Sequence, residues 1–149
     1  MKGKELEARL VSAEDKRFRQ LVKELDTCLT GKLKEEYRKL DQVLTACVML
    51  KDGQAVACGA IRELDESCAE VTHLYVKPEH RKNGLGRKVL ETLELQALWQ
   101  GYLSTGLVAA LSMKEVTRLF RKFGYEQAYP WKPWAGEKFC VCMLKDMEE

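Results

Sequence analysis

The chain has 149 residues, 46% of them hydrophobic and 32% charged, which excludes both an intrinsically disordered chain and a membrane-embedded one. Its 25 basic and 23 acidic residues give a net charge of only +2, so no overall field attracts nucleic acid or anionic lipid. This length suits one compact domain, and we expect residues 1–149 to form it.

The cysteines and the N-terminal segment indicate the compartment. None of the six cysteines forms a CxxC pair, and we expect reduced, buried thiols rather than disulfides or metal ligands. The segment MKGKELEARL is charged from its second residue, and no apolar run approaches the ~20 residues that span a bilayer. The sequence therefore predicts a cytoplasmic protein that binds no metal and does not enter the membrane.

The first third of the chain predicts one strand and two helices. Residues 6–11 alternate apolar and polar side chains, as a half-buried strand does. Ser12 followed by Asp15 approximates a capping box, and we expect the helix that it opens to stop at Gly31. A second, short helix is expected within residues 32–40. The apolar face of the first helix consists of Phe18, Leu21, Val22, Leu25 and Leu29.

The middle third predicts three strands. Residues 44–50 and 55–62 flank an Asp-Gly turn, which is the strongest short-range signal for a β-hairpin in the chain. Residues 68–76 are rich in β-branched and aromatic side chains, which favour a strand. Pro78 keeps the chain from continuing that strand.

An RKNGLG segment separates this strand from the next helix. A helix start offers unpaired N–H groups and the positive end of the helix dipole, and Gly84 and Gly86 would let a phosphate approach the main chain. Arg81, Lys82 and Arg87 add positive charge, which favours a polyanionic ligand over a single carboxylate. Lys82 precedes the glycines and no GK[ST] follows them, so the segment is not a P-loop.

The last third predicts helices and strands in alternation. The helix after the glycines ends at Gly101, where a strand begins, and Ser112 with Glu115 forms a second capping box for a helix that Gly124 ends. Residues 138–144 form the last strand. The apolar faces of the two helices comprise Leu85, Val89, Leu90, Leu93, Ala97 and Leu98 in the first, and Val116, Leu119, Phe120 and Phe123 in the second. This order predicts a mixed α/β sheet with helices on both faces and a ligand site near the glycine turn, where a parallel strand pair diverges.

Two motifs carry a family resemblance. A strand ending in Val76, then Pro78, then RKNGLG opening a long helix resembles the signature of the GNAT family of N-acetyltransferases, and LFRKFGY at 119–125 resembles that family's later helix end. The resemblance covers nearly the whole chain. It implies a mixed, mostly antiparallel central sheet with a splayed parallel strand pair. It also implies transfer of acetyl from acetyl-CoA to a primary amine of a small molecule or peptide, by direct attack in a ternary complex.

The resemblance is closer still to a bacterial-type subgroup of this family. Members of the subgroup read roughly GCGA in the hairpin, LETG in a later strand and SVCMxK at the end. This chain has ACGA at 57–60, LSTG at 103–106 and CVCMLK at 140–145. The subgroup indicates the reaction type rather than the substrate.

Carried over by position, the resemblance implies a binding site for acetyl-CoA. The main-chain N–H groups from Arg81 to Arg87 would hold its pyrophosphate, and backbone groups of residues 74–76 would pair with the pantetheine arm as if it were an added strand. The N–H of Val76 would polarise the thioester carbonyl. The cofactor-binding residues implied in this way are Leu74, Tyr75, Val76, Arg81, Lys82, Asn83, Gly84, Leu85, Gly86 and Arg87.

Glu70 is the candidate general base, because it lies six residues before Val76, where histone-modifying members of the family carry a catalytic glutamate. Period-two alternation predicts Glu70, Thr72, Leu74 and Val76 on one face of the strand. The alternative for Glu70 is a solvated carboxylate near a strand start. His73 is the competing base, but the alternation turns it away from Glu70, which favours a hydrogen-bonded structural histidine.

Two departures from the family leave a second function open. Phe120 stands where the family has a tyrosine that protonates the departing thiolate. A thiolate of low pKa can leave without help, and Tyr125 or Tyr75 could substitute only if the geometry allows. Ser104 replaces the subgroup's glutamate. The alternative to a transferase is therefore a catalytically degenerate protein that binds acetyl-CoA or CoA as a sensor or scaffold, and only a transferase releases thiol.

The aromatic loop and the partners stay open at this level. Trp131 and Trp134, beside two prolines, either line a substrate lid or pack on the sheet edge. A free sheet edge would favour a homodimer, but the sequence does not show which edge is free. The sequence identifies no individual acetyl acceptor.

Overall fold

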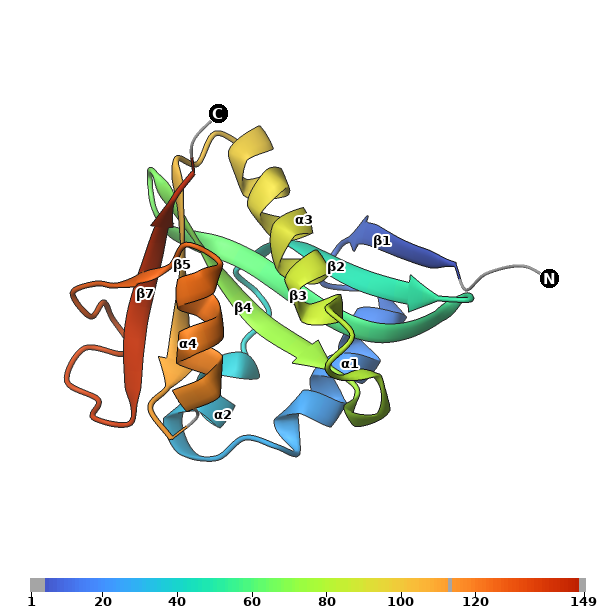
Figure 1. Cartoon of the computed structure of the whole chain (residues 1–149), viewed down its shortest axis with the longest axis horizontal. Helices are drawn as coiled ribbons and strands as arrows, with labels where there is room; N and C mark the ends of the chain where they lie inside the picture. The colour runs from blue at the N-terminus through green and yellow to red at the C-terminus, as the bar shows by residue number, and fades with distance from the viewer. Residues whose placement is uncertain (1–4, 113, 148–149) are drawn as a thin grey trace.

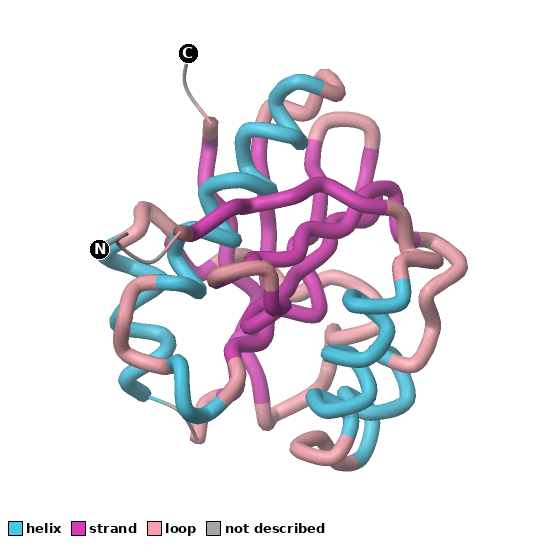
Figure 2. Tube along the Cα trace, turned by 90° about the vertical axis from the view of Figure 1, so that its right-hand side faces the viewer, coloured by secondary structure: helices cyan, strands magenta, loops and turns pink. Residues whose placement is uncertain are grey.

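The computed structural model describes residues 5–112 and 114–147 and confirms a mixed α/β sheet with helices on both faces (Figures 1 and 2). The seven strands lie in the order β1-β2-β3-β4-β5-β7-β6, and every neighbouring pair is antiparallel except β4 and β5. No helix within the described ranges is long and apolar enough to cross a membrane. The elements in chain order are β1 (Leu6–Val11), α1 (Lys16–Asp26), α2 (Gly31–Tyr37), β2 (Val43–Lys51), β3 (Gln54–Asp65), β4 (Cys68–Val76), the 3₁₀ helix η1 (Pro78–His80), α3 (Leu85–Trp99), β5 (Ser104–Ala110), α4 (Lys114–Lys122), β6 (Glu126–Gln127) and β7 (Cys140–Asp146).

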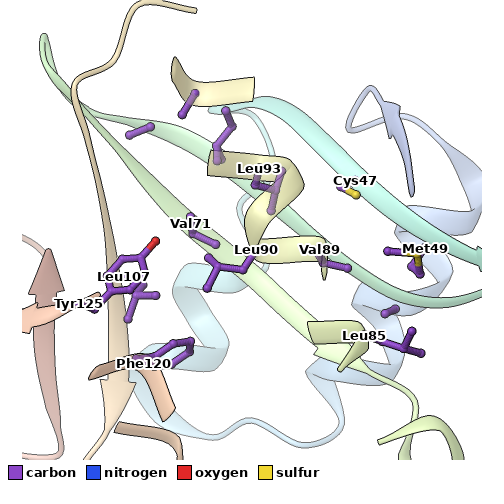
Figure 3. Packing of buried hydrophobic residues seen from close by; sticks show 14 of the residues in the cluster. Cys47, Met49, Val71, Leu85, Val89, Leu90, Leu93, Leu107, Phe120 and Tyr125 are labelled. Atoms are coloured by element: carbon purple, nitrogen blue, oxygen red, sulfur yellow. The ribbon is translucent and has the colours of Figure 1, made fainter. Parts of the chain in front are cut away.

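Each face of the sheet has its own apolar core. On one face α3 and α4 pack over the strands, and Figure 3 shows Leu90 and Leu93 of α3 close to Val71 of β4. On the other face α1 packs over the strands. The α1 side chains in this second core are Phe18, Leu21, Val22 and Leu25, which are four of the five apolar residues that the sequence predicted for that helix.

The Asp-Gly hairpin is confirmed. Asp52 and Gly53 connect β2 to β3 with φ angles of 50° and 85°. Two successive positive φ angles are the mark of a type I′ turn, whose twist matches the twist of the paired strands.

The predicted limits of the first helix are wrong at both ends. Asp15 is the N-cap of α1, and its carboxylate accepts from the main-chain N–H groups of Arg17 and Phe18. The Ser12 hydroxyl instead accepts from the N–H of Glu14 and holds the turn before the helix, as short polar side chains do when they bond to a nearby main-chain N–H. The helix ends at Asp26, and Gly31 opens α2 rather than stopping α1.

Two burial predictions also fail. Strand β1 is exposed along most of its length because it is an edge strand, and its Leu10 is 43% exposed. On α4, Leu119 is 47% exposed, whereas Phe120 is buried beneath the helix. The capping box predicted for α4 spans Met113, which lies outside the described residues.

Candidate active site

The parallel strands β4 and β5 pair over three residues and then separate. The pairs run from Cys68 with Ser104 to Glu70 with Gly106, and beyond them each strand continues without pairing to the other (Figure 1). An unpaired strand edge presents N–H and C=O groups in a row, which is the surface that an extended ligand joins by β-strand addition. Glu70 therefore lies at the point of divergence, while Ser104 lies at the closed end of the pair.

Strand β4 contains a bulge at His73. The φ angle of His73 is 56°, and the register with β3 shifts there, so that β4 has one residue more than β3 between two paired positions. Gly59 of β3 lies opposite the bulge. A Cβ on Gly59 would lie 2.8 Å from Leu93 Cδ1, so glycine at this position allows α3 to approach the strands closely.

The bulge corrects the face assignment made from the sequence. Leu74 and Val76 pack with the core beneath α3. On the opposite face of the sheet, the His73 ring stacks on the Tyr37 ring, with 4.6 Å between the ring centroids. Glu70 lies on that face too, because it bonds to Trp134, which belongs to the same aromatic cluster as Tyr37. The prediction that Glu70 shares a face with Leu74 and Val76, and that His73 points away from it, is wrong because the extra residue reverses the alternation.

The predicted anion site lies at the N-terminus of α3. Gly84 is the N-cap with a φ angle of 77°, and no side chain caps the helix, so the first N–H groups stay available. Leu85 is buried and anchors the helix start, whereas Asn83 is exposed. A Cβ on Gly86 would lie 3.6 Å from Val76 Cγ2, which places this turn beside the end of β4.

The basic side chains of the turn are partly held by the chain itself. Arg81 Nε donates to the carbonyl of Val76 at 2.9 Å, and Arg87 Nε bonds to Glu91 at 3.2 Å. Both guanidinium groups stay largely exposed, as does Lys82. The cluster of positive charge that the sequence predicted is therefore present around the uncapped N–H groups.

Glu70 is buried, not solvated. It is 2% exposed, its Oε1 accepts from Arg62 Nε at 3.0 Å, and its Oε2 accepts from Trp134 Nε1 at 3.2 Å. Sequence reasoning missed both partners. The short connection between β3 and β4 was the available signal for Arg62, because it brings opposite charges to directly paired positions of the two strands. Nothing local marked Trp134, which lies 64 residues away along the chain.

His73 is a neutral, hydrogen-bonded histidine. Its Nε2 lies 2.7 Å from the carbonyl oxygen of Tyr37, which can only accept, so Nε2 carries the proton and Nδ1 accepts from the Thr72 hydroxyl at 2.8 Å. Burial lowers the pKa of His73 to about 4. The hydrogen bond to the Tyr37 carbonyl acts to raise that pKa, and repulsion by the Arg62 charge acts to lower it. These contacts support the structural interpretation of His73.

The two phenols considered as replacements for the missing tyrosine are both bonded to carboxylates. The Tyr125 hydroxyl donates to Glu94 Oε2 at 2.7 Å, and burial together with that carboxylate raises the pKa of Tyr125 above its ordinary range. The Tyr75 hydroxyl donates to Glu24 Oε1 at 3.4 Å, on the α1 side of the sheet. Phe120 itself is buried in the core beneath α3 and α4.

The loop before β7 packs its two tryptophans on the sheet. Trp134 is 1% exposed and clusters with side chains of β7, so the sheet-packing interpretation holds for it. The Trp131 ring lies against Gly106 of β5, where a Cβ would come within 2.9 Å of Trp131 Cη2. The indole N–H of Trp131 is buried without a hydrogen-bond partner in the described part of the chain.

Comparisons with known proteins agree with this geometry. A family model described as "Acetyltransferase (GNAT) domain" matches residues 42–127. Among relatives, an "IAA acetyltransferase" of Azospirillum brasilense is 28% identical over 138 residues, which cover 86% of this chain and 89% of that protein.

Solved structures share the fold along almost the entire chain. A candidate acyl-CoA N-acyltransferase from Klebsiella pneumoniae superimposes with a TM-score of 0.82 at 25% identity, covering 96% of this chain and 98% of that one. A GNAT family acetyltransferase from Elizabethkingia anophelis, solved with acetyl-CoA bound, gives a TM-score of 0.75 at 15% identity, covering 95% and 98%. At 15% identity the second match shows the fold alone.

Proposed function

The chain belongs to the GNAT acetyltransferase family, and we propose that it transfers acetyl from acetyl-CoA to a primary amine of a small molecule or peptide, by direct attack in a ternary complex. The observation that carries this proposal is the divergence of β4 from β5 beside the uncapped N-terminus of α3. The unpaired strand edge suits the extended arm of a thioester, and the uncapped helix N-terminus suits the phosphates at the end of that arm. We also propose that residues 1–149 form one such domain and that the protein is cytoplasmic.

The residues at the α3 turn fit the pyrophosphate of acetyl-CoA. A Cβ on Gly84 would meet no atom within 4 Å, so there is open space beside the N-cap residue. The exposed side chains of Arg81, Lys82 and Arg87 supply the positive charge that a pyrophosphate needs. When bound, acetyl-CoA supplies the acetyl group on a thioester. The Arg81 N–H donates to the Pro78 carbonyl at 3.3 Å, so we propose that the N–H groups from Lys82 to Arg87 hold its phosphates, with the Arg81 side chain adding charge.

The open edge of β4 fits the pantetheine arm. The Lys77 N–H donates to the carbonyl of Val56 on β3. Main-chain groups of successive residues in a strand point to alternate sides, so the N–H and C=O of Val76 point away from β3 and toward the opening between β4 and β5. The same alternation directs the backbone of Leu74 toward the opening, whereas that of Tyr75 turns toward β3. We propose that Leu74 and Val76 make the main-chain contacts with the arm, and that the Val76 N–H polarises the acetyl carbonyl.

Glu70 is proposed as the general base. An amine must lose a proton before it attacks, and each oxygen of the Glu70 carboxylate accepts one hydrogen bond and retains a further lone pair. One C–N bond forms and one C–S bond breaks. Of the two protons that the ammonium loses, one passes through water to Glu70 and on to solvent, and the other ends on the thiolate. Phe120 has no proton to give, and the hydroxyls of Tyr125 and Tyr75 are bonded to carboxylates. We therefore propose that no side chain acts as the acid.

The subgroup assignment has physical support in two of its motifs. The glycine of ACGA is Gly59, which lets α3 approach the sheet, and the glycine of LSTG is Gly106, which makes room for Trp131. Both glycines flank the site from neighbouring strands. We therefore propose that the chain belongs to the subgroup with these motifs.

A homodimer is proposed through the groove between β1 and α3. This groove has a volume of about 580 Å³ and is lined by Leu10, Leu95 and Trp99 among others. Trp99 is 86% exposed, which is unusual for so large an apolar side chain. Sedimentation of the wild type as a dimer, and of Trp99→Lys as a monomer, is expected; a monomeric wild type would remove this proposal.

The function is tested by mixing the protein with acetyl-CoA and a panel of amines while free thiol is followed. We expect amine-dependent thiol release, and a loss of kcat of about 100-fold or more in Glu70→Gln. Glu36→Gln is the matched control, because it also removes a largely buried, ion-paired carboxylate but lies on α2 rather than on the paired residues of β4 and β5. Binding of acetyl-CoA without thiol release from any amine would contradict the transferase and favour the sensor.

A further inference from the structure

Arg62 carries hydrogen-bond donors that the protein does not use. Its side chain is only 10% exposed, and Nε is its one nitrogen that bonds, to Glu70 Oε1 at 3.0 Å. No hydrogen bond joins Nη1 or Nη2 to another group within residues 5–112 and 114–147. A guanidinium has five N–H donors, so four of them lack a protein acceptor in a largely buried position.

The Arg62–Glu70 pair is arranged so that the end of the guanidinium stays free. Arginine and a carboxylate usually pair through two parallel hydrogen bonds. Here Glu70 gives only one oxygen to Arg62, because its second oxygen accepts from Trp134 at 3.2 Å. The Nη1 and Nη2 atoms therefore keep the fork geometry that matches a second carboxylate.

These nitrogens are also reachable. Among the fully buried side-chain nitrogen and oxygen atoms of the described residues, Trp131 Nε1 is the one that lacks a partner. Because Nη1 and Nη2 of Arg62 are not among the enclosed, unpartnered atoms, they retain some contact with solvent.

A second unused donor lies on the other side of Glu70. Glu70 pairs in register with Arg62 on β3 and with Gly106 on β5. The Trp131 ring rests on Gly106, with Cζ2 3.2 Å from the position of a Cβ, and Cζ2 is one ring carbon away from Nε1. The buried carboxylate is therefore flanked on both neighbouring strands by donors without acceptors. An unsatisfied buried donor is costly, and of these donors the Arg62 nitrogens, which keep some contact with solvent, are the ones that an acceptor-rich ligand can satisfy, whereas the Trp131 N–H is enclosed.

We propose that the acetyl acceptor is an amino acid, whose carboxylate binds the free end of the Arg62 guanidinium while its amino group faces Glu70. This inference rests on the proposed acetyl transfer. An amino acid carries an ammonium and a carboxylate a few atoms apart, and Glu70 and Arg62 present the opposite charges side by side. The rings of Tyr37 and Trp131 pack against the cluster of Trp134, whose indole bonds to Glu70, so the surroundings of the carboxylate are apolar.

The test compares amino acids with the amines that lack their carboxylate, such as phenylalanine with phenethylamine, tryptophan with tryptamine, and lysine with cadaverine. We expect wild-type kcat/KM to be about 10- to 100-fold higher for the amino acid of at least one pair, as the loss of a charged hydrogen-bonding partner predicts. In Arg62→Lys that ratio should fall towards one, mainly through KM for the amino acid, because lysine keeps the charge but loses the fork.

The controls separate this inference from the proposed function. Arg9→Lys, on the exposed strand β1, should keep the wild-type ratio, and an unchanged thermal shift with acetyl-CoA shows that Arg62→Lys is folded. Thiol release at equal rates with both members of every pair would overturn the carboxylate site and leave the transferase intact. Silence with every amine would overturn both. If Arg62→Lys does not fold, the wild-type ratio alone decides.

Discussion

Gly84 combines a backbone conformation that favours glycine with a position in front of the α3 N–H groups. Its φ angle is 77°, and alanine in that region costs about 1 kcal/mol. We expect Gly84→Ala to lose about that much unfolding free energy and to weaken acetyl-CoA binding about tenfold. Because the protein leaves the space around this Cβ empty, any loss of affinity must come from the ligand side.

The matched control for this substitution is Gly101→Ala. Gly101 has a φ angle of 98° and equally open surroundings, but it lies at the far end of α3. Titration calorimetry with acetyl-CoA should distinguish the two variants, while urea unfolding should rank them as similar. Equal affinities in both variants would remove the turn from the cofactor site.

His73 makes the stability of the fold depend on pH. Its pKa is about 4 in the folded protein, mainly because of burial, and about 6.5 in an unfolded chain. Below pH 6.5 the unfolded state binds a proton that the folded state refuses, so stability falls as pH falls, by about 1.4 kcal/mol per unit down to pH 4.

Urea unfolding of the wild type should therefore show a His73 contribution of about 2 to 3 kcal/mol between pH 7 and pH 4.5. In His73→Gln this part of the pH dependence should disappear, since an amide does not titrate. His80→Gln removes the other histidine and serves as the control. An unchanged pH dependence in His73→Gln would mean that the imidazole is not buried as a neutral group.

At the scale of the elements, the start of α1 depends on Asp15. Its carboxylate accepts two main-chain N–H groups, and the hydrogen bond from the Arg17 side chain is the largest cause that lowers the pKa of Asp15. We expect Asp15→Ala to reduce the unfolding free energy by about 1 kcal/mol, whereas Asp15→Asn keeps the cap and loses less. Because the folded pKa is lowered, this stabilisation is lost as pH falls through it.

Glu14→Ala is the control for the prediction about the Asp15 N-cap. Glu14 precedes Asp15 and forms an exposed ion pair with Arg19, which contributes little in water. Thermal or urea unfolding of the three variants should place only Asp15→Ala well below the wild type. A loss in Glu14→Ala as large as in Asp15→Ala would show that the first turn, rather than the cap, stabilises the helix.

The distance between α3 and the sheet is set at Gly59. A Cβ there would come within 2.9 Å of Val89 Cγ1 as well as 2.8 Å of Leu93, and both belong to the rigid inner face of the helix. We expect Gly59→Ala to displace α3, to cost about 1 to 3 kcal/mol of unfolding free energy, and to weaken acetyl-CoA binding by moving the phosphate turn.

Gly106→Ala should behave differently from Gly59→Ala, although the new Cβ would be equally crowded at both positions. Its nearest neighbours are Leu144 and Trp131, on the β5 side of the opening, so the acceptor rather than the cofactor should be disturbed. Unfolding, calorimetry with acetyl-CoA and KM for the amine together distinguish the two glycines. Equal effects on the cofactor and on the amine would contradict the assignment of the two ligands to the two sides.

At the scale of the whole molecule, acetyl-CoA would join elements that otherwise diverge. A ligand that contacts β4, α3 and β5 stabilises the folded state by mass action, by about 2.7 kcal/mol at 100 times its Kd. For a chain of this length that corresponds to a rise in Tm of about 5 to 10 °C. Pantetheine or an adenosine diphosphate alone should give smaller shifts at the same concentration. An unchanged Tm in the presence of acetyl-CoA would contradict the cofactor assignment.

Local patterns in the sequence predicted the order of the helices and strands apart from the short elements η1 and β6, and they also predicted the hairpin turn and the glycine turn before α3. These features depend on local chemistry: Asp-Gly adopts positive φ angles, and Gly84 adopts one at the helix start. The apolar periodicity of α3 also predicted its buried side chains, because one helix face suffices to define them. The family resemblance rested on the same local motifs.

The groups that surround Glu70 come together only in the folded sheet. The bulge at His73 reversed the predicted alternation, because it depends on an unpaired residue opposite Gly59 rather than on a pattern within β4. Trp134 reaches Glu70 from 64 residues away, and the sequence contains no signal for a contact that loop closure and packing create. Local propensity fixes turns and helix faces, whereas the environment of a buried charge is set by segments that meet only when the sheet has formed.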